Sequence, residues 1–401
     1  MPILLLLLAC ASNIRSLYEA DRDAALAPPS QASESWQPEV RVRLSQAALD
    51  EVVQATLDQG LLSWDRELKL AAPLGVTVTV HPQAQVDRLS LSASDSCEGC
   101  LDVDASLEGS ARWSAAGVSG KVPFTAQLGA TMSFALDHRE DAWDVSGSLR
   151  DVRKVKVASA RLGAVDATGL LGDWVEKGLE RARHLALGTL GGAALPLRAA
   201  RLSTDHGLLE IQLLTDVAGG SPVARGDALS EQWDLRIATP TVLALARRAA
   251  FQAGTLAYDT SPVPTSLSLD GQTFHMGLRL WRLSGAGWWR DYTVTGDVQV
   301  KAHKLALSPT DAREEEHSRG AGLADPLAAL AEGRILDAVE GGLAQAFSAA
   351  TGVALGERTL RAHVVAVAGQ AEVLQLQGRL RLSDAATQAD TPNEGGRSLG
   401  R

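Results

Sequence analysis

The sequence predicts an α+β fold built from two tandem domains, each an antiparallel sheet curled around a long helix. Two observations lead to this prediction. A short strand that runs directly into an amphipathic helix occurs twice, about half a chain apart, and each occurrence is followed by segments in which apolar and polar residues alternate. Alternation gives each strand one apolar face that has to be buried, and a strongly twisted antiparallel sheet buries this face by curling around a helix.

The repeated start predicts the tandem arrangement. Strand-like residues 42–44 and 235–237 each lead into apolar residues at helical spacing, over 45–61 and 239–253. Equivalent positions in the two starts are 193 residues apart. This distance is too long for a solenoid repeat and is typical of a duplicated domain.

The remaining elements follow the same order in both halves. A second amphipathic helix is predicted at 168–187 in the first half and at 325–347 in the second half. Alternating strands include residues 76–80, 89–91, 101–103, 128–136, 155–157 and 209–213 in the first half, and 267–269, 274–280, 298–300, 305–307 and 373–382 in the second half. Each half therefore has the strands and the apolar helix surfaces that a core of its own requires.

Composition and pattern divide the chain into six segments. A Gly-Gly-Ser-Pro turn at 219–222 separates the two halves, and the last residues of the chain lack aromatic side chains. We predict a signal peptide at 1–9, a flexible tether at 10–37, an N-terminal domain at 38–216, a linker at 217–230, a C-terminal domain at 231–383 and a disordered tail at 384–401.

Charge and motif content argue against several classes of function. The 401 residues include 48 acidic and 38 basic side chains, a formal net charge of −10, whereas a nucleic-acid binder needs a cationic surface. The eight histidines are scattered without metal-ligand spacing, and the sequence contains no phosphate-binding loop and no nucleophile elbow. We therefore expect no nucleic-acid partner, no cofactor, no metal and no enzymatic activity, and we keep a hydrolase only as a third interpretation.

The first ten residues are typical of an export signal. A run of five leucines ends at Ala9 and Cys10 and is too short to span a bilayer. Leu7-Leu8-Ala9-Cys10 resembles the lipobox of bacterial lipoproteins, in which the cysteine is acylated and becomes the mature N-terminus. The resemblance implies lipidation of Cys10 and, with alanine next, an outer-membrane lipoprotein that faces the periplasm or the cell surface. The alternative is a buried N-terminal strand with an ordinary cysteine.

Cys97 and Cys100 form a compact C-x-x-C motif. Strand-like residues 89–91 precede it and 101–103 follow it, so the motif lies at a hairpin tip rather than at the helix N-terminus that activates a redox thiol. In an oxidising compartment such a pair closes a small structural disulfide. Redox activity and metal binding are the alternatives, although zinc needs two further ligands.

Together these features resemble the TULIP superfamily of tubular lipid-binding proteins, in the tandem two-domain form of bactericidal/permeability-increasing protein. The resemblance covers residues 38–383 and rests on the two strand-into-helix starts, the two closing helices and their tandem order. It implies two super-rolled barrels that meet through a central sheet made near 197–215 and 358–382, in an elongated, boomerang-like molecule. It also implies that each barrel holds the acyl tails of a phospholipid or another acyl lipid between its helix and the concave face of its sheet.

The resemblance assigns the walls of the two lipid tunnels to apolar residues on the helices. These residues are Leu49, Val53, Leu57 and Trp174 in the first half, and Val242, Leu245, Ala249, Val339 and Leu343 in the second half. Their side chains need no polar partner, which fits a carrier without catalytic motifs. Small side chains on the helices leave two interpretations open, which are room for a ligand and close packing of helix on sheet.

Trp288 and Trp289 are predicted membrane contacts. They follow a glycine-rich turn at 285–287 and precede Arg290, and indole rings beside arginine at a hairpin tip suit the interface of a bilayer. The alternative is that the two indoles lie on opposite faces of the strand and one of them enters the core.

From these observations we expect a membrane-anchored protein that binds or transfers lipid in apolar tunnels without covalent chemistry. Its partners would be an acyl lipid and, through the N-terminal acyl anchor, a membrane. The alternative is a structural or adaptor lipoprotein of the same fold, with cores filled by its own side chains.

Overall fold

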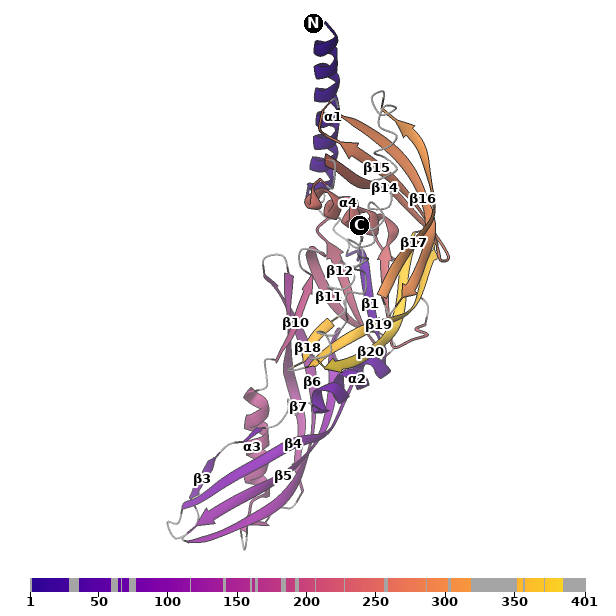
Figure 1. Ribbon diagram of the computed structural model, residues 1–401. Helices are drawn as coiled ribbons and strands as arrows, with labels where there is room; N and C mark the ends of the chain where they lie inside the picture. Colours follow the sequence, from indigo (N-terminus) through magenta and orange to yellow (C-terminus); the bar gives the residue numbers. More distant parts are fainter. Residues whose placement is uncertain are drawn as a thin grey trace, which may run out of the picture.

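The computed structural model is an elongated molecule with three large antiparallel sheets arranged along its length (Figure 1). The structure describes residues 2–28, 36–58, 64–65, 67–71, 77–115, 117–139, 142–158, 161–162, 165–181, 185–191, 195–205, 207–226, 228–255, 259–285, 287–301, 304–318, 352–355, 358–370 and 372–384. Among these residues, helices accompany sheets whose strands pair antiparallel, which confirms the predicted α+β class.

The N-terminal sheet is built from the long strands of the first half. Its strands are β2 (Trp64–Asp65), β3 (Leu68–Ala71), β4 (Thr77–Ala93), β5 (Leu101–Ala115), β6 (Val118–Arg139), β7 (Ala142–Val157) and β10 (Leu185–Gly191), in the order β10-β7-β6-β5-β4-β2, with β3 also on β4. Two helices pack on this sheet, α2 (Gln46–Asp58) against β4 and α3 (Thr168–Arg181) against β7. Along β5, Leu101, Val103 and Leu107 are buried at every second position, so one face of the sheet forms the core with the helices. Two short strands, β8 (Arg161–Leu162) and β9 (Val165–Asp166), form a separate hairpin before α3.

The C-terminal sheet is a four-stranded meander. Its strands are β14 (Thr260–Asp270), β15 (Thr273–Arg282), β16 (Trp288–Lys301) and β17 (Lys304–His317), paired in sequence order. Helix α4 (Thr239–Ala253) packs against β14 at the start of this half. Residues Phe274, Leu278 and Leu280 of the sheet are almost fully buried and form the core of this half together with apolar residues of the central sheet.

The central sheet joins the two halves. Its strands are β1 (Val40–Leu44), β11 (Leu197–Asp205), β12 (Leu208–Thr215), β13 (Trp233–Ala238), β18 (Gly352–Leu355), β19 (Arg358–Gln370) and β20 (Val373–Asp384), in the order β11-β12-β1-β13-β20-β19-β18. The first half thus contributes three neighbouring strands and the second half contributes four. This central sheet agrees with the one predicted near 197–215 and 358–382. The two halves meet where β1 pairs with β13, and we call this strand pair the seam.

The central sheet also carries buried charges. Arg43 of β1 donates hydrogen bonds to both carboxylate oxygens of Asp234 on β13, with Nε 2.8 Å from Oδ1, and both side chains are almost inaccessible to solvent. The predicted linker, 217–230, packs against this charged face, because the backbone carbonyl of Val223 accepts a hydrogen bond of 3.0 Å from Arg41. The linker is therefore packed against the sheet that it connects.

Helix α1 (Pro2–Leu26) corrects the prediction of a flexible tether at 10–37 over its first part, residues 10–26, whereas residues 29–35 lie outside the described residues. Ile14 and Tyr18 of this helix are buried against the C-terminal half. Pro28-Pro29 and the scattered Ser, Ala, Asp and Glu residues led to the expectation of a tether, but Ile14 and Tyr18 are four residues apart, on one face of a helix that includes many good helix-forming residues. The predicted helix at 325–347 lies outside the described residues, as does the predicted tail beyond residue 384.

Candidate functional site: an apolar cavity under helix α4

A cavity lies between α4, the four strands of the C-terminal sheet and β20. Its walls are apolar throughout and consist of Val242, Leu243, Ala246, Pro264, Leu267, Leu269, Phe274, Met276, Val298, Leu305, Leu307 and Leu374. The volume is about 30 Å³, enough for about two water molecules. A cavity with only carbon and thioether surfaces offers a ligand dispersion contacts and removal from water, and it offers no hydrogen bond to water.

The strands present these side chains because of their period-two alternation. Phe274 and Met276 on β15, like Leu305 and Leu307 on β17, are two positions apart and therefore point to the same face of the sheet. On β14 the register shifts at the bulge between Pro264 and Ser266. The alternation of 267–269, 274–280, 298–300 and 305–307 in the sequence predicted this apolar face, but the sequence did not show which of its residues leave a gap.

The predicted wall residues of α4 have three different outcomes. Val242 lines the cavity, as predicted. Leu245 is buried in the core of the C-terminal half but is not part of the cavity wall. Ala249 is exposed, so its prediction as a tunnel residue is wrong. An alanine on an amphipathic helix is a weak marker of the buried face because it also occurs on exposed faces.

In the N-terminal half, the predicted tunnel residues are part of a packed core. Leu49, Val53 and Trp174 are buried and Leu57 is partly buried in the same cluster. The ring of Trp174 lies edge-on to Phe124 with a centroid distance of 6.0 Å. The sequence thus predicted the burial of these residues, and each of them contacts other side chains of the cluster. Val339 and Leu343, predicted for the second tunnel, lie outside the described residues.

The two tryptophans predicted as membrane contacts lie at the start of β16. Trp288 is 5% exposed and belongs to the core, so its prediction as a membrane contact is wrong and the alternative holds, in which one indole enters the core. Trp289 is partly buried on the opposite face of the strand. The guanidinium carbon of Arg279 lies 4.4 Å from the centroid of the Trp289 ring. The hydrogen bond that Arg279 donates to Asp291 raises the pKa of Arg279. The arginine is thus held over the indole as a cation.

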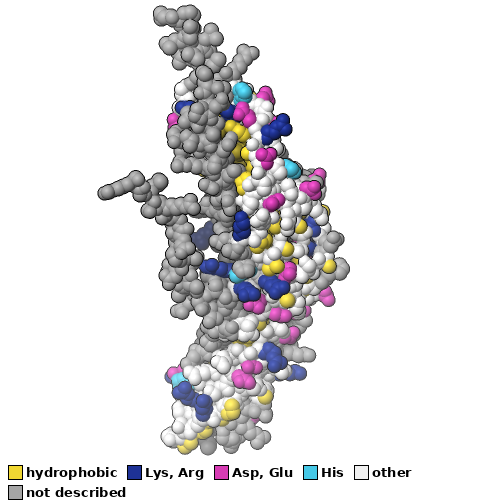
Figure 2. Space-filling view, turned by 45° about the vertical axis from the view of Figure 1, so that its right-hand side comes forward, with side chains coloured by type: hydrophobic (Ala, Val, Ile, Leu, Met, Phe, Trp, Pro, Cys, Tyr) yellow, Lys and Arg dark blue, Asp and Glu magenta, His cyan; other side chains and the backbone are white. Residues whose placement is uncertain are grey.

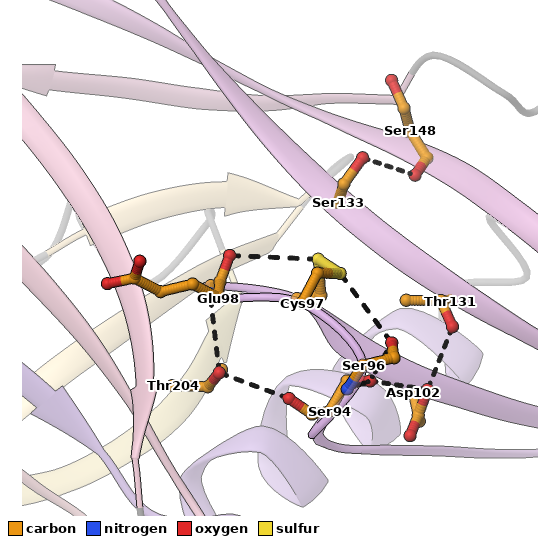
Figure 3. Close-up of a disulfide and its surroundings, with 11 residues drawn as sticks. Ser94, Ser96, Cys97, Glu98, Asp102, Thr131, Ser133, Ser148 and Thr204 are labelled. Carbon is orange, nitrogen blue, oxygen red and sulfur yellow. Dashed lines mark hydrogen bonds between the residues drawn. A yellow bond between two sulfur atoms is a disulfide. The ribbon is translucent and has the colours of Figure 1, made fainter.

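The C-x-x-C motif forms a disulfide, the pairing that the sequence predicted (Figure 3). Cys97 and Cys100 lie in the loop between β4 and β5, and this loop contacts β11 of the central sheet. The backbone N–H of Gly99 donates a hydrogen bond of 3.3 Å to the hydroxyl of Thr204, and Glu98 pairs with Arg201 at 2.7 Å. The disulfide therefore stabilises a loop that connects the N-terminal sheet to the central sheet.

Comparison with solved structures finds several chains of similar fold. No protein-family model and no curated protein matches the chain. The chain is similar to the crystal structure of lipopolysaccharide binding protein, with 13% sequence identity, a TM-score of 0.41 and coverage of 86% of this chain and 99% of that chain. It is also similar to P47 of Clostridium botulinum E1, with 10% identity, a TM-score of 0.37 and coverage of 86% and 100%. These likenesses concern the course of the chain and do not identify a ligand.

The described residues contain few features suited to other kinds of site. No group of three or more histidine, cysteine, aspartate or glutamate side chains among them could hold a metal ion. Within the same residues, no helix is long and apolar enough to cross a membrane. On the face shown in Figure 2, the acidic and basic side chains of the described residues are interspersed along the molecule, and these residues form no large patch of a single sign there. The apolar cavity is therefore the best-defined candidate site.

Proposed function

We propose that this protein binds the acyl chain of a lipid in the cavity under α4 and releases it without covalent change. The observation that carries the proposal is the composition of the wall, in which all twelve side chains are apolar. A sixteen-carbon chain in water costs on the order of 12 kcal/mol relative to an apolar environment, at about 0.8 kcal/mol per methylene. A dry slot whose walls need no polar partner supplies that environment.

The size of the cavity determines how a chain enters. About 30 Å³ is far too small for a complete acyl tail, so α4 has to move away from the C-terminal sheet as the chain is inserted. Helix α4 contacts the sheet mainly through β14, and the small side chain of Ala246 forms part of the wall. Inserted methylenes would replace helix–sheet contacts with helix–lipid and lipid–sheet contacts of the same apolar kind, which keeps the cost of opening low.

The proposal includes an acyl anchor at Cys10 and a position on the outer membrane of a bacterial envelope, facing the periplasm or the cell surface. The leucine run that ends at Ala9-Cys10 is the feature that favours this localisation. Acylation of one cysteine by several chains gives stable membrane attachment, because a single chain binds only marginally. We propose no catalytic role, since neither the sequence motifs nor the cavity wall provides a nucleophile.

A second candidate is a structural or adaptor lipoprotein with filled cores. The small volume of the cavity and the packed cluster around Trp174 favour this candidate. The two functions differ in one property, which is the presence of a bound lipid in the native protein.

Mass spectrometry of the intact protein tests the proposal. The full chain is expressed in a bacterial envelope, extracted in mild detergent and sprayed under native conditions, and its lipids are then identified after organic extraction. A diacyl lipid bound at about one per chain, in addition to the acyl groups on Cys10, is the expected result. Protein that carries no lipid, even after incubation with palmitoyl-oleoyl phosphatidylcholine vesicles, would establish the adaptor candidate. A panel of ester substrates tests the hydrolase interpretation in the same preparation.

A further inference from the structure

Helix α1 is bound to the C-terminal half by a compact aromatic cluster. Ile14 and Tyr18 are 9% and 6% exposed and pack with Phe251 of α4 and Trp281 of β15. The Tyr18 ring meets the rings of Phe251 and Trp281 edge-on, with centroid distances of 5.4 and 5.8 Å. Such edge-to-face pairs contribute stability beyond the area that they bury, so this contact fixes the angle of the helix as well as its position.

Polar contacts and backbone shape add to the binding of α1. Asp21 forms an ion pair with Arg247 of α4, and both side chains are about three-quarters buried. Gly287 has a φ of 65°, and a side-chain carbon at this position would lie 3.1 Å from the nearest atom of Ile14. A glycine with positive φ thus allows the backbone of the sheet to approach the helix closely. The helix is held at several points over two turns.

These contacts lie at one end of the C-terminal sheet. Arg282 of β15 pairs with Trp288 of β16, and the hairpin between them includes Gly287, whose backbone lies close to Ile14. From Ile14 the helix runs inward to the ion pair on α4, so Cys10 lies on the outward side of Ile14. Cys10 is four positions before Ile14 in the helix, about 6 Å along the axis. Figure 1 shows α1 beside the upper end of the C-terminal sheet, with the N-terminal sheet at the opposite end of the molecule.

We propose that α1 fixes the orientation of the protein on the membrane, with the hairpin end of the C-terminal sheet against the lipid bilayer and the N-terminal sheet directed away from it. This inference rests on the proposed acyl anchor at Cys10. A flexible chain over 10–37 would separate anchor and fold by roughly 30 Å, enough for either half to reach the surface. A bound helix removes that freedom, because the anchor is then one helical turn from the sheet. The cavity under α4 would thus belong to the half that lies next to the membrane.

Energy transfer from the protein to labelled vesicles tests the orientation. Ser284→Cys places a label on the β15–β16 hairpin, and Ser119→Cys places one on exposed sequence just after the β5–β6 turn. Cys97 and Cys100 are oxidised, and an acylated Cys10 does not react, so each variant carries one label. With lipidated full-length protein on palmitoyl-oleoyl phosphatidylcholine vesicles that contain a rhodamine lipid, we expect transfer from position 284 to exceed transfer from position 119 several-fold. Equal transfer, or stronger transfer from position 119, would overturn the inference while leaving lipid binding untouched.

Two variants of α1 and one of the anchor complete the experiment. Tyr18→Asp introduces a charge into the aromatic cluster and should bring the two transfer values closer together, whereas Leu17→Asp alters the neighbouring residue, which is 46% exposed, and should keep them apart. If the difference in energy transfer between positions 284 and 119 is the same in Tyr18→Asp as in Leu17→Asp, the bound helix has no role in the orientation. Cys10→Ser should abolish vesicle binding at both labels. If it binds as the parent protein does, the acyl anchor is wrong and the orientation inferred from it falls with it, whatever the mass spectrometry shows about lipid in the cavity.

Discussion

Val42 of β1 and Leu235 of β13 lie opposite each other in the central sheet, and they hold equivalent positions in the two halves of the sequence. Two equivalent strands that pair antiparallel at equivalent residues are related by a local two-fold axis, which here passes between Val42 and Leu235. The same relationship continues outward, since β12 flanks β1 and β20 flanks β13. The duplicated halves therefore join through one copy of the same strand from each, as the subunits of a symmetric dimer do.

The charged side chains on this sheet depart from the symmetry. In the first half Arg41 forms an ion pair with Glu210, and at the equivalent positions Gln375 donates a hydrogen bond of 3.2 Å to Asp234. Asp234 in the second half thus stands where the first half has Arg41, and this aspartate is the partner of Arg43 across the seam. Arg225, which lies in the linker, also pairs with Glu210. Desolvation by burial and repulsion from Arg41 and Arg43 lower the pKa of Arg225. Charge asymmetry thus joins the two copies specifically to each other.

Removal of one partner at the seam should destabilise the whole molecule. In Asp234→Ala the guanidinium of Arg43, whose side chain is 3% exposed, stays buried without its carboxylate, and such losses cost about 3–5 kcal/mol. We expect urea unfolding to show this decrease as a lower transition midpoint. Glu231→Ala is the matched control, since it breaks the ion pair between Glu231, just before β13, and the exposed Arg379 of β20, and should leave the midpoint nearly unchanged. Equal effects of the two substitutions would refute a special role for the buried pair.

Filling of the cavity should remove the bound lipid. Ala246 is part of the wall, so Ala246→Leu puts three more carbon atoms into the space that we assign to an acyl chain. We expect lipid recovered per chain, measured by mass spectrometry after organic extraction, to fall several-fold. Ala249→Leu adds the same atoms three residues further along α4, at an exposed position, and should leave lipid recovery unchanged. Full lipid content in Ala246→Leu would show that the ligand lies elsewhere.

The architecture was predictable wherever the pattern is local. The strand-into-helix start before α2 and the alternation along β5 are properties of neighbouring residues, and they gave the two halves and the faces of their sheets. The same holds for Cys97 and Cys100, because three residues of separation at a hairpin tip bring two thiols together without any knowledge of the rest of the fold.

The features that sequence analysis missed depend on distant partners. Arg43 reads as a polar residue on an alternating strand, and only its pairing with Asp234, 191 residues away, makes its burial favourable. Trp288 was predicted at a membrane surface because its position beside a glycine-rich turn does not reveal the core on the other side of the strand. Tyr18 was assigned to a tether because its aromatic partners belong to the other half of the chain.

Loss of the disulfide should cost a moderate amount of stability. The bridge spans a separation of three residues, and loop entropy for such a short ring gives about 2 kcal/mol. The double variant Cys97→Ser/Cys100→Ser should therefore unfold at lower urea concentration than the oxidised protein and at the same concentration as the reduced protein. A double variant as stable as the oxidised protein would mean that the contacts of Glu98 and Gly99 with β11 hold the loop without the bridge.

Gly99 and Gly117 allow the contact between this loop and the central sheet to be measured. Both have positive φ, 72° and 84°, so alanine at either position pays the backbone strain of about 1–2 kcal/mol. At Gly99 a side-chain carbon would also lie 2.6 Å from the carbonyl oxygen of Leu202 on β11, whereas nothing lies within 4 Å at Gly117. A steric clash in a packed region usually costs about 1–3 kcal/mol. In urea unfolding, Gly99→Ala should therefore lose about this much more stability than Gly117→Ala. Equal losses would mean that the loop can move away from β11 freely, and that the disulfide loop does not hold the N-terminal sheet to the centre of the molecule.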